Sequence, residues 1–336
     1  MRKWRMWLGF ALSALLLYLA LGGLQLDQVL MALRRAHYGW LVPGIAVYFV
    51  GLAVRAWRWH YLLRPIKDVP TVRLFPITAI GYMGNNIYPL RAGELLRVYL
   101  LRRMEAIPIS VSLATILVER AFDGLVMLGF VFLNLSELEG LTASSGIVGS
   151  IRAIALLGAG VFLLATLALF LMAIFPAPTL RLITGLARVL PAGPAAKVSG
   201  FFERFLQGLA FMRSPIDVLM VLLTSVVIWL LETGKYWFVM HAFNFRLSFF
   251  ALMLMNGVVN LATTIPSAPG YLGTFDAPGI AVLQAYGIPA NIAAGYTLVL
   301  HAALWLPVTL LGLYFMARYS LSLRKVRAEM AQEPPT

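Results

Sequence analysis

Long apolar runs separated by short polar segments dominate the chain. The runs with few interruptions cover about residues 6–24, 41–63, 108–135, 150–175, 216–241 and 290–317. A helix needs roughly 20 residues to cross a membrane core about 30 Å thick. The pattern therefore predicts an all-α polytopic membrane protein with about six full spans.

The first run follows three basic residues and could be mistaken for a signal peptide. Its apolar stretch is long for a signal peptide, however, and Ala20-Leu21-Gly22 is a poor cleavage site. We expect this segment to remain as an uncleaved membrane anchor.

Two further apolar segments, about 71–104 and 248–286, are interrupted by residues that break helices. NNIYPLRAGE (85–94, the first break) lies in one, and the stretch 256–279 (the second break), with its prolines and glycines, lies in the other. Proline and glycine at these positions exclude a continuous helix. Irregular backbone at membrane depth is tolerated where it is buried in protein or lines a water-filled cavity. We therefore expect two discontinuous helices that line an internal site.

The distribution of basic residues predicts the topology. Only 12% of the 336 residues are charged and 61% are hydrophobic, yet the formal net charge is +13. Most of the 27 Lys and Arg residues fall at the N-terminus and in 55–73, 91–105, 176–214 and 318–327. Basic segments stay in the cytoplasm. We expect a multi-pass protein of the cell membrane with both termini cytoplasmic, so that the broken segments enter from opposite faces and return.

The order of segments suggests an inverted repeat. A span, a broken segment and a span occupy about 41–135, and the same order returns in about 216–317 with the opposite orientation. Transporters with inverted repeats place their sites near the midplane, at discontinuous helices. We predict one integral-membrane domain over 1–320, with 176–214 as an amphipathic connector at the cytoplasmic interface and 321–336 as a cytoplasmic tail.

The first break carries groups suited to an anion. Arg91 and Glu94 lie at the start of a new helix, where free backbone N–H groups and the helix dipole favour negative charge. Arg97 lies two turns further on and can bind a phosphate, while Asn85 and Asn86 can satisfy backbone groups or bind a polar ligand. The alternative is that Arg91 and Glu94 pair with each other or with a neighbouring span.

The second break contains Asn260, Pro266, Gly270, Gly273 and Asp276. The last of these closes a Thr-Phe-Asp stretch just before a proline, which resembles an N-cap followed by a new helix. An ordinary external loop with a capped helix is the alternative. The flanking apolar runs are too short to span separately, which argues against it.

Charged residues inside a predicted span are candidate functional groups, because charge is costly there. Glu119 and Asp123 are four residues apart and share a helical face, whereas Arg120 points about 100° away. The two carboxylates could pair with Arg91 or Arg97, or one could carry a proton. Plain structural pairing is the alternative.

A second charged pair, Glu232 and Lys235, is three residues apart, so that mutual neutralisation is favoured over a coupling role. His301 is expected to be a hydrogen-bonded residue of the helix bundle rather than a proton relay. The chain has no cysteine and its four histidines lack metal-ligand spacing. We expect no metal, no cofactor and no catalytic residue.

Three motifs together resemble a known family. They are N-x3-P-x-R-x-G-E at 85–94, ER-x2-D at 119–123 and PSAPGYLGTFD at 266–276. In this order on a polytopic background they are similar to the flippase-like, lysylphosphatidylglycerol-synthase transmembrane-region family, over about residues 10–320. The resemblance implies lipid translocation in a bacterial or archaeal cytoplasmic membrane. In multifunctional members this part moves aminoacylated phosphatidylglycerol to the outer leaflet.

The chain differs from those members because it shows no cytosolic aminoacyl-transferase domain, so we do not expect it to synthesise lysylphosphatidylglycerol. We expect a translocase for a phosphatidylglycerol derivative or a polyprenyl phosphate, in which Arg91 and Arg97 hold the phosphate. Glu119 and Asp123 would balance charge or couple protons, and Asn85, Asn86, Asn260 and the loop 266–273 would line the path.

A lipid-modifying enzyme with Glu119 or Asp123 as a base, and a non-transporting scaffold for a lipid synthase, are the alternatives. The expected partners are the lipid substrate and anionic lipids at the cytoplasmic face, with no nucleic acid. A homo-oligomer or a lipid synthase partner is compatible with the sequence.

Overall fold

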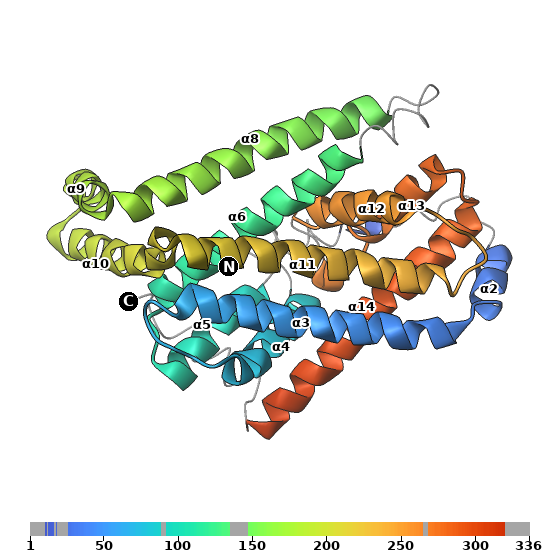
Figure 1. The fold of residues 1–336 in the computed structure, drawn as a ribbon, viewed down its shortest axis with the longest axis horizontal. Coiled ribbons are helices and arrows are strands. Elements are labelled where there is room, and N and C mark those ends of the chain that lie inside the picture. Colours follow the sequence, from blue (N-terminus) through green and yellow to red (C-terminus); the bar gives the residue numbers. More distant parts are fainter. Residues whose placement is uncertain are drawn as a thin grey trace.

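The structure is a computed structural model, and it describes residues 11, 13–16, 18, 26–88, 92–134, 147–264 and 268–319. Every regular element in these residues is a helix (Figure 1). The prediction of an all-helical chain is confirmed for this part.

Three helices in the described part of the chain are long and apolar enough to cross a membrane. They are α3 (Leu41–Leu63), which continues from the short η1 (Tyr38–Trp40), α11 (Pro215–Met240) and α14 (Ala290–Arg318). α3 and α11 lie side by side along the long axis of the molecule, and α14 runs obliquely to them (Figure 1). All three agree with predicted spans. α2 (Leu26–Arg34) packs against α14.

A sharp bend follows the next predicted span. α8 (Ile147–Ile174) meets α9 (Pro176–Ala187) at an angle of 104°, and the pair counts as a fourth crossing if taken as one span. α10 (Ala192–Gly208) and η2 (Ala210–Arg213) complete the segment predicted as an amphipathic connector. The bend occurs at the predicted boundary, because Pro176 starts a new helix.

α6 (Ile109–Leu133) covers the remaining predicted span that the structure describes, and it carries three charged residues in its middle. The run at 6–24 falls largely outside the described residues. The count of six spans and the inverted repeat stay predictions.

The first broken segment forms a helical hairpin of α4 (Thr71–Ile87) and α5 (Ala92–Glu105). The two helices pack against each other through glycines. A Cβ on Gly93 would lie 1.9 Å from the carbonyl oxygen of Gly81, and one on Gly84 would lie 2.8 Å from the Cα of Gly93. Only glycine fits at such an approach. These glycines therefore allow α4 and α5 to pack closely against each other.

The second broken segment consists of α12 (Phe249–Ala262), the short η3 (Pro269–Tyr271) and α13 (Asp276–Ala285). α12 starts where Ser248 accepts a hydrogen bond from the backbone N–H of Ala251 at 3.0 Å, as an N-cap serine does. The α4–α5 hairpin and the α12–α13 segment lie toward opposite ends of the long axis (Figure 1). Entry of the two segments from opposite faces of the membrane stays a prediction.

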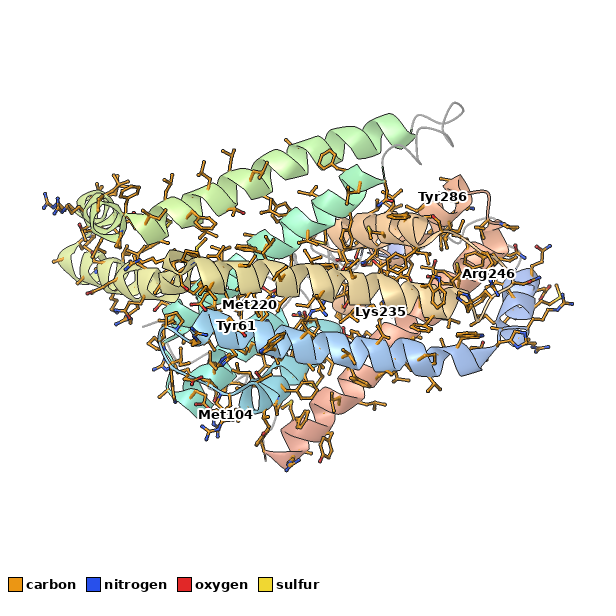
Figure 2. All side chains as sticks on the ribbon, in the orientation of Figure 1. Tyr61, Met104, Met220, Lys235, Arg246 and Tyr286 are labelled. Atoms are coloured by element: carbon orange, nitrogen blue, oxygen red, sulfur yellow. The ribbon has the colours of Figure 1, made fainter. Side chains whose placement is uncertain are left out.

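The outer surface carries many apolar side chains, as lipid contact requires. Leu163, Leu164 and Leu167 of α8 and Leu306 and Leu310 of α14 are all exposed. Several charged groups within the helices lie inside instead. Lys235 is labelled between α3 and α11 in Figure 2 and is only 3% exposed.

Candidate functional site

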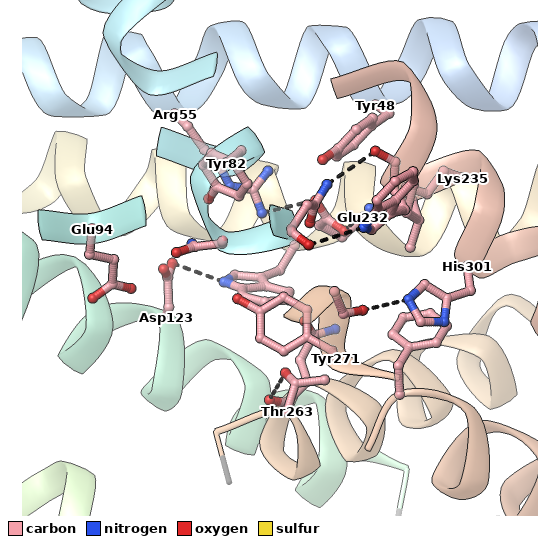
Figure 3. A pocket seen from close by; sticks show the side chains of 18 of the residues that line it. Tyr48, Arg55, Tyr82, Glu94, Asp123, Glu232, Lys235, Thr263, Tyr271 and His301 are labelled. Atoms are coloured by element: carbon pink, nitrogen blue, oxygen red, sulfur yellow. Dashed lines mark hydrogen bonds and ion pairs between the residues drawn. The ribbon is translucent and has the colours of Figure 1, made fainter. Parts of the chain in front are cut away.

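The two breaks meet at one internal cavity of about 130 Å³. Asn85 and Asn86 line it from the end of α4, Asn260 from the end of α12, and Gly270 and Tyr271 from η3. Figure 3 labels Tyr271 among the side chains that surround the cavity. Segments about 170 residues apart in the sequence thus form a single site. The sequence predicted that both breaks would line a path, and the structure brings them together.

Charged side chains from other helices complete the lining. They come from α3, α5, α6 and α11, and cations outnumber carboxylates. The charged groups in contact with the cavity are Arg55, Arg97, Arg120, Lys235, Glu94, Asp123 and Glu232.

On one side of the cavity, the two carboxylates of α6 are held by arginines. Arg97 binds Glu119 through two hydrogen bonds of 2.9 and 3.2 Å, and its guanidinium lies 4.0 Å from the centre of the Trp59 ring. Arg58 binds Asp123 through two bonds of 2.6 and 3.2 Å. Both pairs are almost fully buried, and their fork-like geometry is the strongest form of this interaction. The predicted pairing of a carboxylate with Arg97 is present.

Arg120 does not point away from this cluster. Its side chain turns back so that one guanidinium nitrogen lies 3.2 Å from Asp123, while Nε lies 3.7 Å from Glu94. The 100° separation of the Cβ directions was correct for the backbone. It failed for the guanidinium because a long arginine side chain can reach a residue three positions further along the helix.

On the other side of the cavity, Glu232 and Lys235 form the predicted pair, and a third residue joins it. The guanidinium of Arg55 lies 2.9 Å from Glu232. Its Nε and one terminal nitrogen are buried and have no hydrogen-bond partner. Two cations therefore share one carboxylate, and one of them retains free donors.

Arg55 and Arg58 are the functional candidates that the sequence analysis missed. We had assigned both to a cytoplasmic basic segment at 55–73, but they lie inside α3, 6% and 0% exposed. Their three-residue spacing within an apolar helix places both on one face, toward α6 and α11. That spacing could have identified both residues from the sequence. We did not recognise it because the basic residues were counted by segment.

One helix, α14, binds the first break. Asn86 donates hydrogen bonds to the carbonyl of Trp305 at 3.1 Å and to the hydroxyl of Thr309 at 2.9 Å. The indole N–H of Trp305 donates to the carbonyl of Asn86 at 3.3 Å. These reciprocal bonds fix the end of α4 against α14.

The same helix also binds the second break, through His301. One ring nitrogen lies 2.8 Å from a carboxylate oxygen of Asp276, and the other lies 2.7 Å from the carbonyl of Gly270. The second oxygen of Asp276 accepts the backbone N–H of Gly273 at 2.9 Å. His301 is thus a hydrogen-bonded residue, as expected.

Asp276 differs slightly from the prediction. It is the first residue of α13 rather than its cap, and the cap residue Phe275 contributes no side-chain bond. Its carboxylate instead holds the turn at Gly273, where φ is +79°.

Asn260 links the second break to α11 indirectly. Its amide donates to the side-chain oxygen of Asn256 at 2.7 Å, and Asn256 donates to the hydroxyl of Thr233 at 3.1 Å. This chain of bonds gives the polar end of α12 a defined position beside the cavity.

Most of the predicted site residues line this cavity or lie directly behind it. Glu119, Gly273 and Asp276 bind lining residues or their neighbours without lining the cavity themselves. Arg91 and Pro266 fall outside the described residues. The residues that were predicted and line the cavity are Asn85, Asn86, Glu94, Arg97, Arg120, Asp123, Glu232, Lys235, Asn260 and Gly270.

The chain is similar to a known membrane-protein family and to several archaeal proteins. A family profile described as lysylphosphatidylglycerol synthase TM region matches residues 6–312. A UPF0104 membrane protein of Methanothermobacter thermautotrophicus is 26% identical over 93% of this chain and 92% of its own length. One from Methanocaldococcus jannaschii is 21% identical over 85% and 87%. The glycosyltransferase AglD of Haloferax volcanii is 26% identical over 88% of this chain but only 51% of its own length. No solved structure matches significantly.

Proposed function

The chain belongs to the family of lysylphosphatidylglycerol synthase TM regions, and from this premise we propose that it translocates a phosphate-bearing lipid across the membrane. The headgroup would enter the cavity between the two breaks while the acyl or prenyl chains stay in the bilayer. Phosphatidylglycerol derivatives and polyprenyl phosphates share the chemistry that the cavity would recognise.

The observation that carries this proposal is the surplus of positive charge at Arg55. In the described part of the chain, Arg55 and Lys235 share the single carboxylate of Glu232. Leaving a buried charge without compensation is costly inside a membrane, and such groups mark substrate sites. An incoming phosphate would supply the missing negative charge and accept hydrogen bonds from the free guanidinium nitrogens of Arg55.

The size of the cavity supports headgroup binding. The volume of about 130 Å³ is enough for several water molecules, because one water needs about 10–15 Å³ of such space. That space suits a phosphate with part of its alcohol. In this proposal the lipid tails stay outside the cavity, as translocation along a groove requires.

The roles of the other charged residues follow from their contacts. Arg97 is bound in two places to Glu119, so its charge is already balanced. We propose that Arg97, Arg58 and the α6 carboxylates hold α3, α5 and α6 together around the cavity. Arg91 remains a second phosphate ligand in this proposal, because it directly precedes Ala92 in the sequence, where α5 starts.

A translocation assay tests the proposal. Purified protein is reconstituted into liposomes that contain fluorescent phosphatidylglycerol or fluorescent phosphatidylcholine, and dithionite then quenches the outer leaflet. We expect the protein to accelerate exchange of the phosphatidylglycerol label, and Arg55→Gln to slow it at least about tenfold, because each charged hydrogen bond contributes about 1.5–3 kcal/mol. Arg318→Gln, at an exposed arginine of α14, is the matched control. Rates equal to those of protein-free liposomes for every lipid would refute translocation.

A second candidate function rests on the relative from Haloferax volcanii. A glycosyltransferase matches this chain over half of its own length, which favours a membrane domain that serves a transferase by binding its lipid substrate. Labelled lipid incubated with the purified protein separates the two proposals. Binding without exchange between leaflets would favour this role beside a transferase, whereas chemical conversion of the lipid would make the chain itself an enzyme.

A further inference from the structure

We propose that His301 and Asp276 form a proton-binding site that controls how the second break is attached to α14. The site stands on the contacts of its two side chains, and it does not depend on which molecule the cavity binds. Its ligand is a single proton held in the contact between the imidazole Nδ1 and the carboxylate.

The hydrogen bonds of His301 require this proton. Its Nδ1 faces a carboxylate oxygen at 2.8 Å and its Nε2 faces the carbonyl of Gly270 at 2.7 Å. A carbonyl is only an acceptor, so Nε2 must carry a hydrogen. A neutral imidazole carries one hydrogen in all, which leaves Nδ1 facing the carboxylate with a lone pair. Both contacts therefore form only when one further proton is present, either on Nδ1 or on Asp276.

Loss of that proton breaks one of the two contacts. The neutral imidazole has a single N–H, and its hydrogen bond to the buried carboxylate is charge-assisted and hence the stronger one. The hydrogen then resides on Nδ1, and the bare Nε2 repels the carbonyl of Gly270. Deprotonation accordingly releases η3 from α14, whereas Asp276 keeps its bond to Gly273.

The location of His301 ties this event to both breaks. His301, Trp305 and Thr309 are spaced four residues apart on α14, so they share one face. The first holds the second break through Gly270, and the other two hold the first break through Asn86. One face of α14 thus binds both breaks. The proton controls the contact to the second break, at Gly270, and leaves the contacts to the first break, at Asn86, unchanged.

Several titratable and charged side chains face His301 and Asp276, and their electrostatic interactions depend on whether the proton is bound. Asp276 is fully buried on α13, and Phe275 lies against the imidazole with its ring centre 4.6 Å away. Across the cavity lie the charged side chains and phenols of α3, α4, α5, α6, α11 and η3 (Figure 3). These groups are Tyr48, Arg55, Tyr82, Glu94, Arg97, Arg120, Asp123, Glu232, Lys235, Tyr236 and Tyr271.

The absence of cysteine from the sequence makes a distance measurement straightforward. Spin labels are placed on the variant Leu272→Cys/Leu310→Cys, at two exposed positions beside η3 and on α14. Distances between the labels are measured by pulsed electron paramagnetic resonance, in lipid and without added substrate, at about pH 5 and about pH 9, on either side of the range in which histidine changes charge. We expect a longer-distance population to appear at the higher pH.

Three further variants on that background test the assignment. His301→Gln and Asp276→Asn should each give a distribution that no longer changes with pH. His241→Gln removes a histidine whose Nδ1 lies 2.8 Å from the carbonyl of Trp237. This variant should respond to pH as the labelled parent does. A parent distribution that is the same at both pH values, or a response that persists in His301→Gln, would overturn the proposal.

Nitrogen-15 spectra of histidine-labelled protein in bilayers give a second measurement that needs no spin label. The His301 resonance, identified by its absence from His301→Gln, should change with pH in the wild type. In Asp276→Asn the Nε2 signal should be that of a protonated nitrogen at both pH values, because the amide can accept from Nδ1–H or donate to a bare Nδ1. A wild-type resonance that stays constant across the same range would overturn the proton site. The translocation assay would be unaffected by that outcome, so the two proposals can fail independently.

Discussion

Removing the charge of Asp123 should destabilise the protein strongly. Its carboxylate accepts both hydrogen bonds from Arg58 and a third from the indole N–H of Trp229 at 3.0 Å, and it lies 3.2 Å from Arg120. Asp123→Asn keeps the shape of the side chain but leaves two cations beside a neutral amide. Because Arg58 is fully buried, it cannot turn toward water to recover the lost interaction.

The size of the effect follows from this geometry. Removing one partner of a buried ion pair costs about 3–5 kcal/mol. Glu119 lies 4.0 Å from Arg58 and can offset only part of this loss, because it is already bound to Arg97. In a protein of this size such a loss lowers the midpoint of thermal unfolding by on the order of 10 °C. The measurement is thermal unfolding in detergent, followed by circular dichroism under identical conditions for each variant.

Two comparisons make the test specific to the pair. Asp27→Asn removes an exposed carboxylate from α2 and should change the unfolding free energy by less than about 0.5 kcal/mol. The variant Arg58→Met/Asp123→Asn should lose less than the sum of its single changes, by about 2–3 kcal/mol. A midpoint for Asp123→Asn that matches that of Asp27→Asn, or strictly additive losses, would refute the claim that the pair is a buried structural unit.

Further changes test the two breaks. Gly93→Ala should lower the unfolding free energy by at least about 3 kcal/mol, because the added Cβ would lie 1.9 Å from a carbonyl oxygen; Gly185→Ala, with open space around it, should be nearly neutral in the same thermal assay. Trp305→Phe removes the bond to the carbonyl of Asn86 and should speed hydrogen exchange at the end of α4, and unchanged protection there would contradict that contact. Arg91→Ala should slow translocation of labelled phosphatidylglycerol by about tenfold or more, and an unchanged rate would remove Arg91 from the phosphate site.

The sequence predicted the helical class and the positions of both breaks because these depend on local chemistry. Apolar runs of sufficient length define spans, and prolines and glycines define where helices stop. α4 ends at Ile87 and α5 starts at Ala92, as the stretch around Pro89 predicts. The bend before Pro176 could be placed for the same reason.

The sequence could not predict which charged residues meet across helices. Arg58 binds a carboxylate 65 residues away, and Arg55 binds one on α11. Such pairs depend on which helices are neighbours, and a single sequence does not contain that information. Arg55 and Arg58 were counted with the cytoplasmic basic residues of 55–73, because charge alone does not distinguish a buried arginine of a span from one that flanks it.

Local sequence patterns also could not predict how the second break packs against α14. Gly270 adopts a φ of +71°, and a Cβ there would lie 2.7 Å from the indole nitrogen of Trp305. The motif indicated a glycine that breaks a helix. It could not indicate that this glycine makes room for α14 beside the cavity.

The proposed function requires above all that the cavity between the two breaks binds a phosphate-bearing headgroup at Arg55. Native mass spectrometry of the gently purified protein tests this requirement most directly, with wild type, Arg55→Gln and Arg318→Gln compared in the same detergent. We expect a phospholipid or polyprenyl phosphate bound to the wild type and to Arg318→Gln, and lost from Arg55→Gln. Equal retention in all three proteins, or no bound lipid in any of them, would contradict this requirement.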